Sequence, residues 1–297
     1  MQYIDNSEII IIINPNSGNG KTSKIIESIK NIDEGLFYII TKNADEVRDV
    51  FAKYIDKYKV FVVVGGDGTI NEAIKHLQNQ PDKYLSVYPN GSGNGFAKEL
   101  GFKRDFKSLI NDINRGETMD LDLLKINNAF SINALGIGLD SFVAHEFSKT
   151  KRRGLINYIL LTVKSVFVFK PFSAEISYDD SEIIDGAFKM ITIANTRQFG
   201  NNAFIAPAAK PNDGFIDLVL VKPFPFYLYP YFSIKLFLGL LKQSKYVQYI
   251  KTNKSVSIRS KFNKFHIDGE PHTFKEALEI SIVRNKIKII KTSHNNL

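Results

Sequence analysis

Glycines, an aspartate and a threonine are concentrated in one short segment of this chain. It reads Val62-Val63-Val64-Gly65-Gly66-Asp67-Gly68-Thr69-Ile70-Asn71-Glu72. The apolar residues predict a buried strand, the glycines predict a tight turn, and a helical pattern begins at Ile70. A strand that passes into a helix in this way leaves backbone N–H groups unpaired at the turn, and such groups bind phosphate. We therefore expect a nucleoside triphosphate to bind here.

The side chains of this turn add further chemistry. The backbone can approach a ligand closely at three positions, which are Gly65, Gly66 and Gly68. Asp67 supplies a carboxylate for a phosphate-bound magnesium ion or for a proton. Thr69 offers a hydroxyl to a phosphate and to the helix N-terminus, and Asn71 and Glu72 extend the polar face. The alternative is a purely structural glycine turn.

Two more turns of the same kind follow strand-like runs. They read Asn14-Pro15-Asn16-Ser17-Gly18-Asn19-Gly20-Lys21-Thr22 and Pro89-Asn90-Gly91-Ser92-Gly93-Asn94-Gly95-Phe96-Ala97. The first is close to a Walker A loop, but Pro15 replaces the first glycine and removes an N–H group, so we reject that motif. An ordinary strand-to-helix turn and a plain glycine-rich loop are the alternatives. Three polar turns at three strand ends favour one shared cleft.

The elements that must position these turns alternate between strand and helix patterns. We expect strands at residues 9–13, 37–40, 60–64 and 85–88. We expect helices at residues 21–29, 44–54, 70–77 and 95–100, with Asn43 as the N-cap of the second. This order predicts a Rossmann-like parallel sheet with helices on both faces, and ligands bind beyond the carboxyl ends of such strands.

The pattern changes after Leu121, where short strand-like runs dominate. They lie at residues 129–135, 174–178, 188–194, 215–221, 255–258 and 278–283. We expect an antiparallel β-sandwich or barrel, interrupted by two apolar helices at Leu155–Phe169 and Tyr227–Leu241. The predicted fold class is therefore α/β plus all-β. The domains are residues 1–122, with residues 285–297 as a candidate return segment, and residues 123–284.

Bulk properties narrow the class of protein. The chain has 297 residues and no cysteine, which excludes disulfides and thiolate metal sites. Its start lacks the features of a signal peptide, so we expect a cytoplasmic protein. The net charge of +8 fits an anionic membrane surface or an ordinary lysine-rich surface, and no nucleic-acid motif is present. Phe224–Leu241 is the best candidate for a membrane span, but Pro225, Pro230 and Lys235 argue against one.

Several short motifs occur in the order found in the diacylglycerol kinase catalytic domain. They are Asn14–Gly18, Gly65–Thr69, Pro89–Asn94, Asn195, Ala206-Pro207, Asp213-Gly214 and Asp268-Gly269-Glu270. From about residue 8 to residue 290 the chain resembles this family, which includes bacterial diacylglycerol kinases, YegS-like lipid kinases, sphingosine kinases and ceramide kinases. The Gly65–Thr69 motif alone is shared with NAD kinases and phosphofructokinases, so the ordered set gives the resemblance its specificity.

The resemblance implies ATP, magnesium and a lipid as ligands. The residues it implies for ATP are Asn14, Pro15, Asn16, Ser17, Gly18, Thr41, Gly65, Gly66, Asp67, Gly68, Thr69, Asn71, Glu72 and Ser92. It implies a magnesium ion held by the Asp213 carboxylate and the carbonyls of Lys210 and Phe215, at an acidic turn whose chemistry suits this ion. A plain Asn-Asp-Gly turn is the alternative. The five histidines show no metal-ligand spacing.

The resemblance also implies a carboxylate that takes the proton of the lipid hydroxyl. Asp268 and Glu270 come first as candidates, ahead of Asp67, although Asp268-Gly269 by itself is typical of a hairpin turn. Asp140 and Asp122 are implied to face the polar head of the lipid, where a carboxylate could pair with an amine or a hydroxyl. The alternative for Asp140 is an ordinary surface carboxylate.

The sequence departs from the family pattern at one position, and it carries one feature that bears on membrane binding. Gly95 stands where bacterial diacylglycerol kinases usually carry an aspartate, which favours the sphingosine and ceramide kinase branch and puts in doubt a network towards the structural magnesium. Residues 151–153 are basic and lie beside the first apolar helix, which predicts peripheral docking on a membrane; two ordinary core helices are the alternative. A homodimer is a candidate assembly.

These observations predict an ATP- and magnesium-dependent lipid kinase. It would phosphorylate a hydroxyl group of a diacylglycerol or a sphingoid-type lipid, at the edge of a membrane and with no nucleic-acid partner. Two rival functions stay open. One is a kinase for a soluble substrate, similar to NAD kinase, and the other is a non-catalytic regulator that binds a lipid or a nucleotide.

Overall fold

The computed structural model of the chain describes residues 3–18, 22–91, 93–150, 155–179 and 182–295. The chain divides into two compact units. Unit 1 consists of Met1–Leu121 and Asn285–Leu297, and unit 2 consists of Asp122–Arg284. Two strands, β5 (Thr118–Ile126) and β16 (Leu278–Ile290), run from one unit into the other along the chain.

Unit 1 is built on a parallel sheet. Its strands are β1 (Ile9–Ile13), β2 (Phe37–Ile40), β3 (Val60–Gly65) and β4 (Tyr84–Pro89), in the order β2-β1-β3-β4. The last part of β16 adds a further parallel strand, in which Ile289 pairs with Leu85 of β4. Every residue of β1 and β3 is buried, as expected for a parallel sheet that helices cover.

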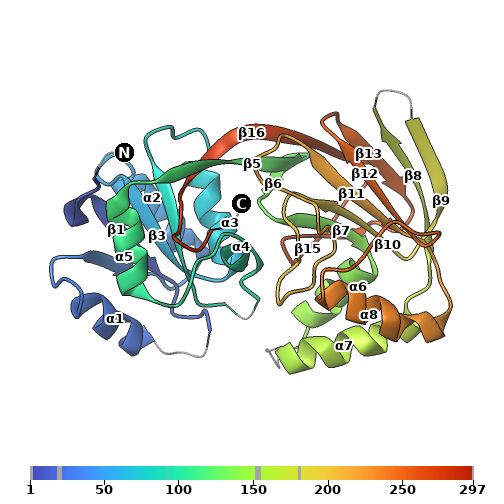
Figure 1. Ribbon diagram of the computed structural model, residues 1–297, viewed down its shortest axis with the longest axis horizontal. Helices are drawn as coiled ribbons and strands as arrows, with labels where there is room; N and C mark the ends of the chain where they lie inside the picture. Colours follow the sequence, from blue (N-terminus) through green and yellow to red (C-terminus); the bar gives the residue numbers. More distant parts are fainter. Residues whose placement is uncertain (1–2, 19–21, 92, 151–154, 180–181, 296–297) are drawn as a thin grey trace. The chain divides into compact units, whose positions relative to one another are not determined.

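Within its described residues, unit 1 also has five helices, which Figure 1 labels, and one short 3₁₀ segment. They are η1 (Asn6–Glu8), α1 (Thr22–Lys30), α2 (Ala44–Tyr54), α3 (Asp67–Leu77), α4 (Gly95–Glu99) and α5 (Phe106–Arg115). Asn43 caps α2 as predicted, because its side chain accepts a hydrogen bond from the backbone N–H of Glu46. The sequence pattern did not reveal α5, although Asp105 caps its start and Gly116 ends it in a left-handed conformation.

Unit 2 contains two packed antiparallel sheets. One has the order β12-β11-β10-β7-β14-β15, and β5, β6, β8, β9, β13 and the first part of β16 form the other. The bounds are β6 (Ala129–Ser131), β7 (Ala134–Gly138), β8 (Phe172–Tyr178), β9 (Glu182–Phe188), β10 (Met190–Ala194), β11 (Ile216–Val221), β12 (Val247–Thr252), β13 (Val256–Ser260), β14 (Lys264–Ile267) and β15 (Glu270–Thr273). Buried side chains of both sheets, among them Ile137, Ile193, Ile176 and Ile258, form one core. The predicted fold class, α/β followed by a β-sandwich, is thus confirmed.

Three helices and a 3₁₀ segment accompany the sandwich. They are α6 (Leu139–Ser148), α7 (Leu155–Val168), η2 (Phe226–Leu228) and α8 (Tyr229–Phe237). The buried ammonium of Lys189 donates to the carbonyls of Val166 and Phe169 at the end of α7, and it lies over the ring of Tyr229 in α8. Burial lowers the pKa of Lys189, while the C-terminal carbonyls of α7 favour its positive charge. Lys189 therefore joins α7 to α8.

Within the described residues, no helix combines the length and apolar character needed to cross a bilayer.

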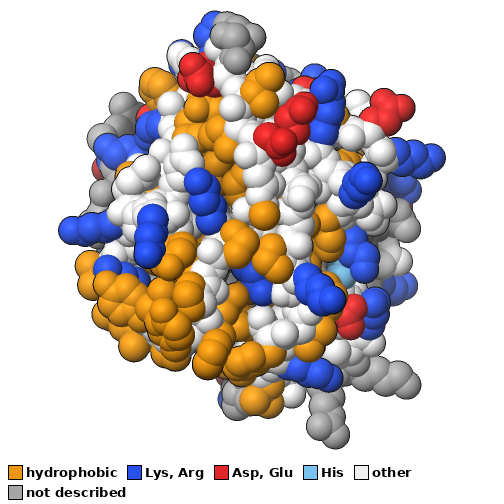
Figure 2. Space-filling model, turned by 90° about the vertical axis from the view of Figure 1, so that its right-hand side faces the viewer, with side chains coloured by type: hydrophobic (Ala, Val, Ile, Leu, Met, Phe, Trp, Pro, Cys, Tyr) orange, Lys and Arg blue, Asp and Glu red, His pale blue; other side chains and the backbone are white. Residues whose placement is uncertain are grey.

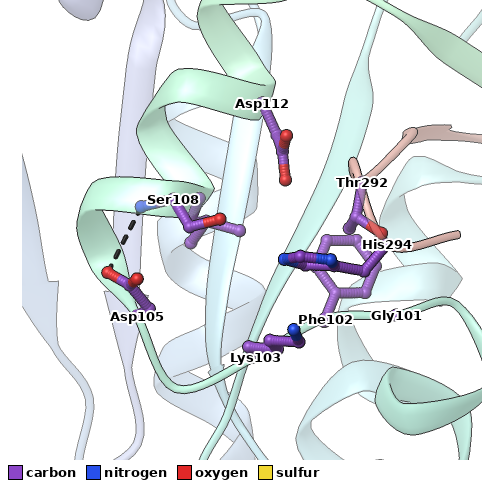
Figure 3. A pocket seen from close by; sticks show the side chains of 9 residues that line it. Gly101, Phe102, Lys103, Asp105, Ser108, Asp112, Thr292 and His294 are labelled. Atoms are coloured by element: carbon purple, nitrogen blue, oxygen red, sulfur yellow. Dashed lines mark hydrogen bonds between the residues drawn. The ribbon is translucent and has the colours of Figure 1, made fainter.

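The last described residues pack against the α5 region of unit 1. Thr292 Oγ1 donates to the carbonyl of Leu100 at 2.8 Å, and the Ser293 N–H donates to Asp112 Oδ1 at 3.2 Å. Gly101 has φ +77°, and a side chain there would collide with His294. The pocket that remains measures only about 10 Å³, which is at the lower limit for one water molecule (Figure 3). This segment is therefore a packed part of unit 1.

Candidate functional site

The three predicted turns of unit 1 are linked by side-chain hydrogen bonds. Asn14 Nδ2 in the first turn donates to Thr69 Oγ1 in the second at 2.9 Å. Asn90 Nδ2 in the third turn donates to the carbonyl and to the hydroxyl of Ser17 in the first, both at 3.1 Å. Because all three turns follow the carboxyl ends of parallel strands, these bonds gather their backbone N–H groups at one edge of the sheet.

The second and third turns approach each other through glycine. A Cβ atom on Gly91 would lie 2.5 Å from Gly66 Cα, a distance that only the absence of a side chain permits. The Gly91 N–H also donates to Asn94 Oδ1 at 2.7 Å, and Asn94 itself has φ +50°. Gly18 meets the same restriction in the first turn, where an added Cβ would lie 2.5 Å from the carbonyl oxygen of Asn90. The glycines therefore set how closely the turns pack.

Asp67 makes a contact that the sequence did not reveal. Its carboxylate accepts the backbone N–H of Gly95 at 3.2 Å and that of Phe96 at 3.3 Å, at the start of α4. A negative charge is favourable at a helix N-terminus, so Asp67 anchors α4 to α3. The roles predicted for Asp67, as a magnesium ligand or a base, stay predictions.

The start of α3 corrects one expectation. The helix begins at Asp67 rather than at Ile70, and its N-cap is Gly66, which makes no side-chain cap bond. Thr69 therefore lies inside the first turn of the helix, and the predicted capping role of Thr69 is wrong. Its hydroxyl instead accepts the bond from Asn14. Asp67 and Gly68 belong to the helix and not to the turn that the glycines predict, and an acidic residue is favourable in a first helical turn.

Other residues implied for ATP differ in how they are placed. Thr41 is buried, and its hydroxyl donates to the carbonyl of Ile13. Asn16 is exposed, and its Nδ2 donates to the Lys42 carbonyl at 2.9 Å. Glu72 pairs with Lys75 at 2.6 Å. Pro15, Gly65 and Asn71 lie in or beside the same turns. Ser92, residues 19–21 and the basic residues 151–153 lie outside the described residues.

In unit 2, the Asp268-Gly269 turn joins β14 to β15. Both residues have positive φ, +50° and +88°, as a type I′ hairpin turn requires. The Asp268 carboxylate accepts four hydrogen bonds, from Ser131 Oγ at 2.7 Å and from the backbone N–H groups of residues 132–134 at 3.2, 3.0 and 2.8 Å. A carboxylate offers about four acceptor sites, so Asp268 has little capacity left for a substrate proton.

Glu270 has a different environment. It is exposed at the start of β15 and lines a pocket of about 370 Å³. The other residues that line this pocket are Ala144, Phe147, Ser148, Gly269, Pro271 and His272. An accessible carboxylate beside a pocket is placed to take a proton from a bound hydroxyl group. Of the two carboxylates in the hairpin, Glu270 is the accessible one, and the role of base stays a prediction for both.

The positively charged side chain of Lys251 lies against two carboxylates at the turn around Asp213. The Lys251 ammonium lies 2.7 Å from Asp213 Oδ2 and 3.5 Å from Asp217 Oδ2. Asp213 Oδ1 accepts the Phe215 N–H at 3.0 Å, which closes the turn. Burial raises the pKa of Asp217, and the Lys251 ammonium opposes this shift. Asp213 is thus already paired with an ammonium group, and its role as a magnesium ligand stays a prediction.

Asp122 and Asn195 fix the same turn from the interior. Asp122 is 2% exposed, and its Oδ2 accepts the Gly214 N–H at 2.7 Å. Asn195 Nδ2 donates to the carbonyls of Asp122 and Ile132, both at 2.9 Å. Asp122 is therefore placed to shape the turn, and its predicted contact with the lipid stays a prediction from the resemblance.

Asp140 is the second residue of α6, and its side chain is only 9% exposed. The alternative of an ordinary surface carboxylate is therefore wrong. Its Oδ2 lies 3.4 Å from His266 Nε2. Nothing in the sequence pointed to His266, because the two residues are far apart in the chain and only the fold brings them together.

Comparison with known proteins identifies the family. Residues 8–126 match the diacylglycerol kinase catalytic domain, and residues 133–290 match the YegS C-terminal NAD kinase beta sandwich-like domain. The chain belongs to the diacylglycerol kinase catalytic-domain family. This confirms the resemblance drawn from the ordered motifs, and it makes the protein a member of a lipid kinase family.

Individual relatives agree with this assignment. A probable lipid kinase YegS-like protein of Shewanella frigidimarina is 27% identical over 79% of this chain and 77% of its own length. The diacylglycerol kinase of Bacillus subtilis is 26% identical over 88% of each chain. A crystal structure of a diacylglycerol kinase from Bacillus anthracis has a TM-score of 0.72 at 20% identity and covers 97% of both chains.

A more distant likeness concerns the fold alone. An NAD kinase from Archaeoglobus fulgidus, solved in complex with ATP, has a TM-score of 0.56 at 11% identity and covers 96% of this chain. The likeness covers the fold of most of this chain, at a lower TM-score than that of the Bacillus anthracis structure.

Proposed function

We propose that this member of the family transfers the γ-phosphoryl group of ATP to a hydroxyl group of a lipid, a diacylglycerol or a sphingoid-type lipid. The observation that carries the proposal is Glu270, an exposed carboxylate beside a pocket of about 370 Å³, on the Asp-Gly-Glu hairpin of a chain from a lipid kinase family. We assign the nucleotide site to unit 1, and we assign the base and the binding of the lipid acceptor to unit 2.

The nucleotide side rests on the three linked turns of unit 1. Their glycines leave backbone N–H groups open to phosphate oxygens, and the N-terminus of α3 adds a partial positive charge. The γ-phosphate carries a charge that magnesium neutralises during transfer, and we propose that this ion enters with ATP. Asp67, at the first residue of α3, is the carboxylate of this turn that could meet it.

The proposed transfer needs one base, which takes the proton of the lipid hydroxyl group. The lipid oxygen attacks the γ-phosphorus, its bond to phosphorus forms as the bond to the ADP oxygen breaks, and the hydroxyl proton passes to the Glu270 carboxylate. ADP leaves with the electron pair of the broken bond. In such transfers the protein contributes mainly positioning and electrostatic stabilisation, and a positioned base adds to these.

The test is a transfer assay with radiolabelled ATP. The purified protein is incubated with magnesium and with mixed micelles that contain diacylglycerol, sphingosine or ceramide, and in parallel with NAD. We expect the label to enter the organic phase as a phosphorylated lipid, whose identity mass spectrometry then establishes. Label in an aqueous nucleotide would support the NAD kinase-like alternative, and ATP binding without any transfer would support the non-catalytic regulator.

We also propose that the Asp213 turn binds a structural magnesium ion through the Asp213 carboxylate and the carbonyls of Lys210 and Phe215. The described residues contain no group of three or more acidic or histidine side chains that could hold a metal, but this ligand set needs only one carboxylate. The turn fits a cation, because the Lys251 ammonium already lies 2.7 Å from Asp213 Oδ2. Bound there, magnesium would fix the conformation of the turn.

Replacing Lys251 with methionine should strengthen magnesium binding at this turn. The ammonium competes with the ion for Asp213, and a half-exposed ion pair of this kind contributes about 0.4–1 kcal/mol, so the apparent Kd should fall about two- to fivefold. The measurement is the unfolding midpoint as a function of magnesium concentration, without nucleotide. Lys245→Met serves as the control, because Lys245 lies over Tyr246 rather than beside Asp213. A magnesium response in neither protein would contradict a structural ion.

The helices of unit 2 expose a broad apolar surface. On α7 it consists of Leu160, Val163, Phe167 and Val168, and on η2 and α8 of Phe226, Tyr227, Tyr231, Ile234 and Phe237. Figure 2 shows hydrophobic side chains gathered along the lower edge of this face of the protein. The alternative of two ordinary core helices is wrong, because Phe167 of the first segment is 72% exposed and Tyr227 of the second is 66% exposed. We propose that this surface, called the α7–α8 surface, docks on the membrane that contains the substrate.

Replacing Phe167 with aspartate should weaken binding to lipid vesicles by at least about tenfold. Burial of a phenylalanine side chain contributes about 1.5–3 kcal/mol, and a charge at the same position opposes insertion. Co-sedimentation with vesicles that contain 30% anionic lipid measures the effect. Ile183→Asp is the matched control, because Ile183 is 62% exposed but lies on β9. Equal losses for both variants would rule out docking through the α7–α8 surface.

A further inference from the structure

A buried Asp–His pair lies beside the hairpin that carries Glu270. His266 Nε2 is 3.4 Å from Asp140 Oδ2, and the two side chains are 6% and 9% exposed. On the other edge of the ring, His266 Nδ1 accepts the backbone N–H of Gly269 at 3.3 Å. Because Nδ1 is the acceptor, the hydrogen-bond pattern assigns the proton of the neutral ring to Nε2, which faces Asp140.

The fold provides the space for this pair at a glycine. Gly136 on β7 lies between Thr192 on β10 and His266 on β14 in the register of the sheet. A side chain on Gly136 would collide with both Asp140 Oδ2 and His266 Nε2. The Asp140 and His266 side chains therefore occupy the space that the Cβ atom of any residue other than glycine would need at position 136.

His266 is the polar side chain that faces the buried Asp140 Oδ2 oxygen. Asp140 Oδ1 accepts the Ser141 N–H at 2.7 Å, but among the described residues Oδ2 has no hydrogen-bond partner that meets ordinary geometry. The contact between this oxygen and His266 Nε2, 3.4 Å apart, is therefore electrostatic rather than a hydrogen bond of ordinary geometry, and the cost of burying the oxygen favours an imidazole N–H directed towards it.

The hairpin is consequently fixed at two consecutive residues. The Asp268 carboxylate binds the backbone of residues 132–134, and the Gly269 N–H binds His266. Glu270 follows directly, and its side chain is exposed beside the pocket. Because a two-residue turn has few soft dihedrals, the orientation of Gly269 sets the direction in which Glu270 leaves it.

We propose that His266, held in place by Asp140, is a positioning residue that orients the Asp268-Gly269-Glu270 turn so that Glu270 faces the acceptor hydroxyl. This inference rests on the proposed function of Glu270 as the base. It predicts that His266 acts on the rate of transfer through Glu270 and has no contact of its own with ATP.

Three substitutions of His266 test the contacts of its two ring nitrogens separately. In His266→Asn, the amide oxygen can replace Nδ1 as the acceptor for Gly269. In His266→Gln, the amide reaches the position of Nε2 beside Asp140 but leaves Gly269 without its acceptor, and His266→Phe removes both contacts and keeps a ring. We expect His266→Phe and His266→Gln to lower kcat by about 10- to 100-fold at an unchanged KM for ATP, because small displacements of a catalytic group have effects of this size. His266→Asn should recover kcat to within about threefold of the wild-type protein.

The decisive measurement is a double-mutant cycle with Glu270→Gln. If His266 acts through Glu270, His266→Phe should cause no further loss in the Glu270→Gln background. Losses that multiply would overturn the inference, and so would wild-type kcat in His266→Phe. If the wild-type protein transfers no phosphate to any lipid, or if Glu270→Gln keeps full activity, the proposed function fails instead.

A measurement that does not depend on enzyme activity tests the hydrogen bond between Gly269 and His266 directly. Hydrogen exchange followed on the peptide that contains residues 264–273 should show faster exchange of the Gly269 amide in His266→Phe, with slow exchange restored in His266→Asn. Asp140→Asn should give an intermediate rate, because it keeps the volume and weakens the hold on the ring. Identical exchange in all variants would overturn the inference, whatever the outcome of the lipid assays.

Discussion

Replacing Glu270 with glutamine should lower kcat for phosphoryl transfer to the lipid by about 10²- to 10⁴-fold, the range in which a positioned general base contributes. Glutamine keeps the size and the hydrogen-bonding reach of the side chain but cannot accept the hydroxyl proton. Because Glu270 is exposed, the unfolding midpoint should stay within about 1 °C of the wild-type value. Steady-state kinetics in mixed micelles and a thermal melt measure the two effects.

Asp268→Asn is the matched control for this experiment. The Asp268 carboxylate accepts four hydrogen bonds, and an asparagine turns an amino group towards donors that need an acceptor. We expect a loss of about 2–4 kcal/mol in the free energy of unfolding, because hydrogen bonds to a charged group are the stronger kind. A stable but inactive Asp268→Asn protein, together with an active Glu270→Gln protein, would assign the base to Asp268 instead.

Gly91→Ala should weaken ATP binding by about 100-fold. The new methyl group would lie 2.5 Å from Gly66 Cα. The methyl carbon is bonded directly to the backbone of residue 91 and Gly66 Cα is a backbone atom, so neither can move aside without displacing a phosphate-binding turn. A displacement of about 1 Å at such a site has an effect of this order. Equilibrium titration with a fluorescent ATP analogue measures the Kd.

Gly186→Ala is the corresponding control. Gly186 has no positive φ, and the nearest atom to an added Cβ would lie at an ordinary 3.7 Å. The Kd for ATP should therefore stay within about twofold of the wild-type value. Wild-type affinity in Gly91→Ala would mean that ATP does not contact the packed pair of turns.

Periodicity and capping residues predicted the elements with a strong local signal. Two parallel strands of unit 1, at Ile9–Ile13 and Val60–Gly65, follow from apolar runs rich in β-branched residues, and both are confirmed. Helix α6 has a weaker signal, because its N-cap is Gly138 at φ +108° and no side chain caps it. The start of α3 was placed too late, because Gly68 has low helix propensity and only the context of the phosphate turn makes it helical.

The candidate site could be predicted only in part, for a different reason. The residue types of the three turns and of the Asp-Gly hairpin follow from local chemistry, and their assignment to a family of lipid kinases is confirmed. Their partners come from distant positions in the sequence. Asn90 reaches Ser17 across 73 residues and Asp268 reaches Ser131 across 137, and no short motif contains such pairs. Without them, Asp268 and Glu270 look equivalent as bases.

The path of β16 has a consequence for how the protein is made. Ile289 completes the sheet of unit 1 beside β4, and its neighbours Ile287 and Ile290 are equally buried. A ribosome synthesises these residues only after the whole of unit 2. Until then β4 has an open, apolar edge that could pair with another nascent chain. Because the first part of β16 also pairs with β13 in unit 2, one late strand completes the sheets of both units, and the edge of β4, beside the nucleotide site, is the last to be covered.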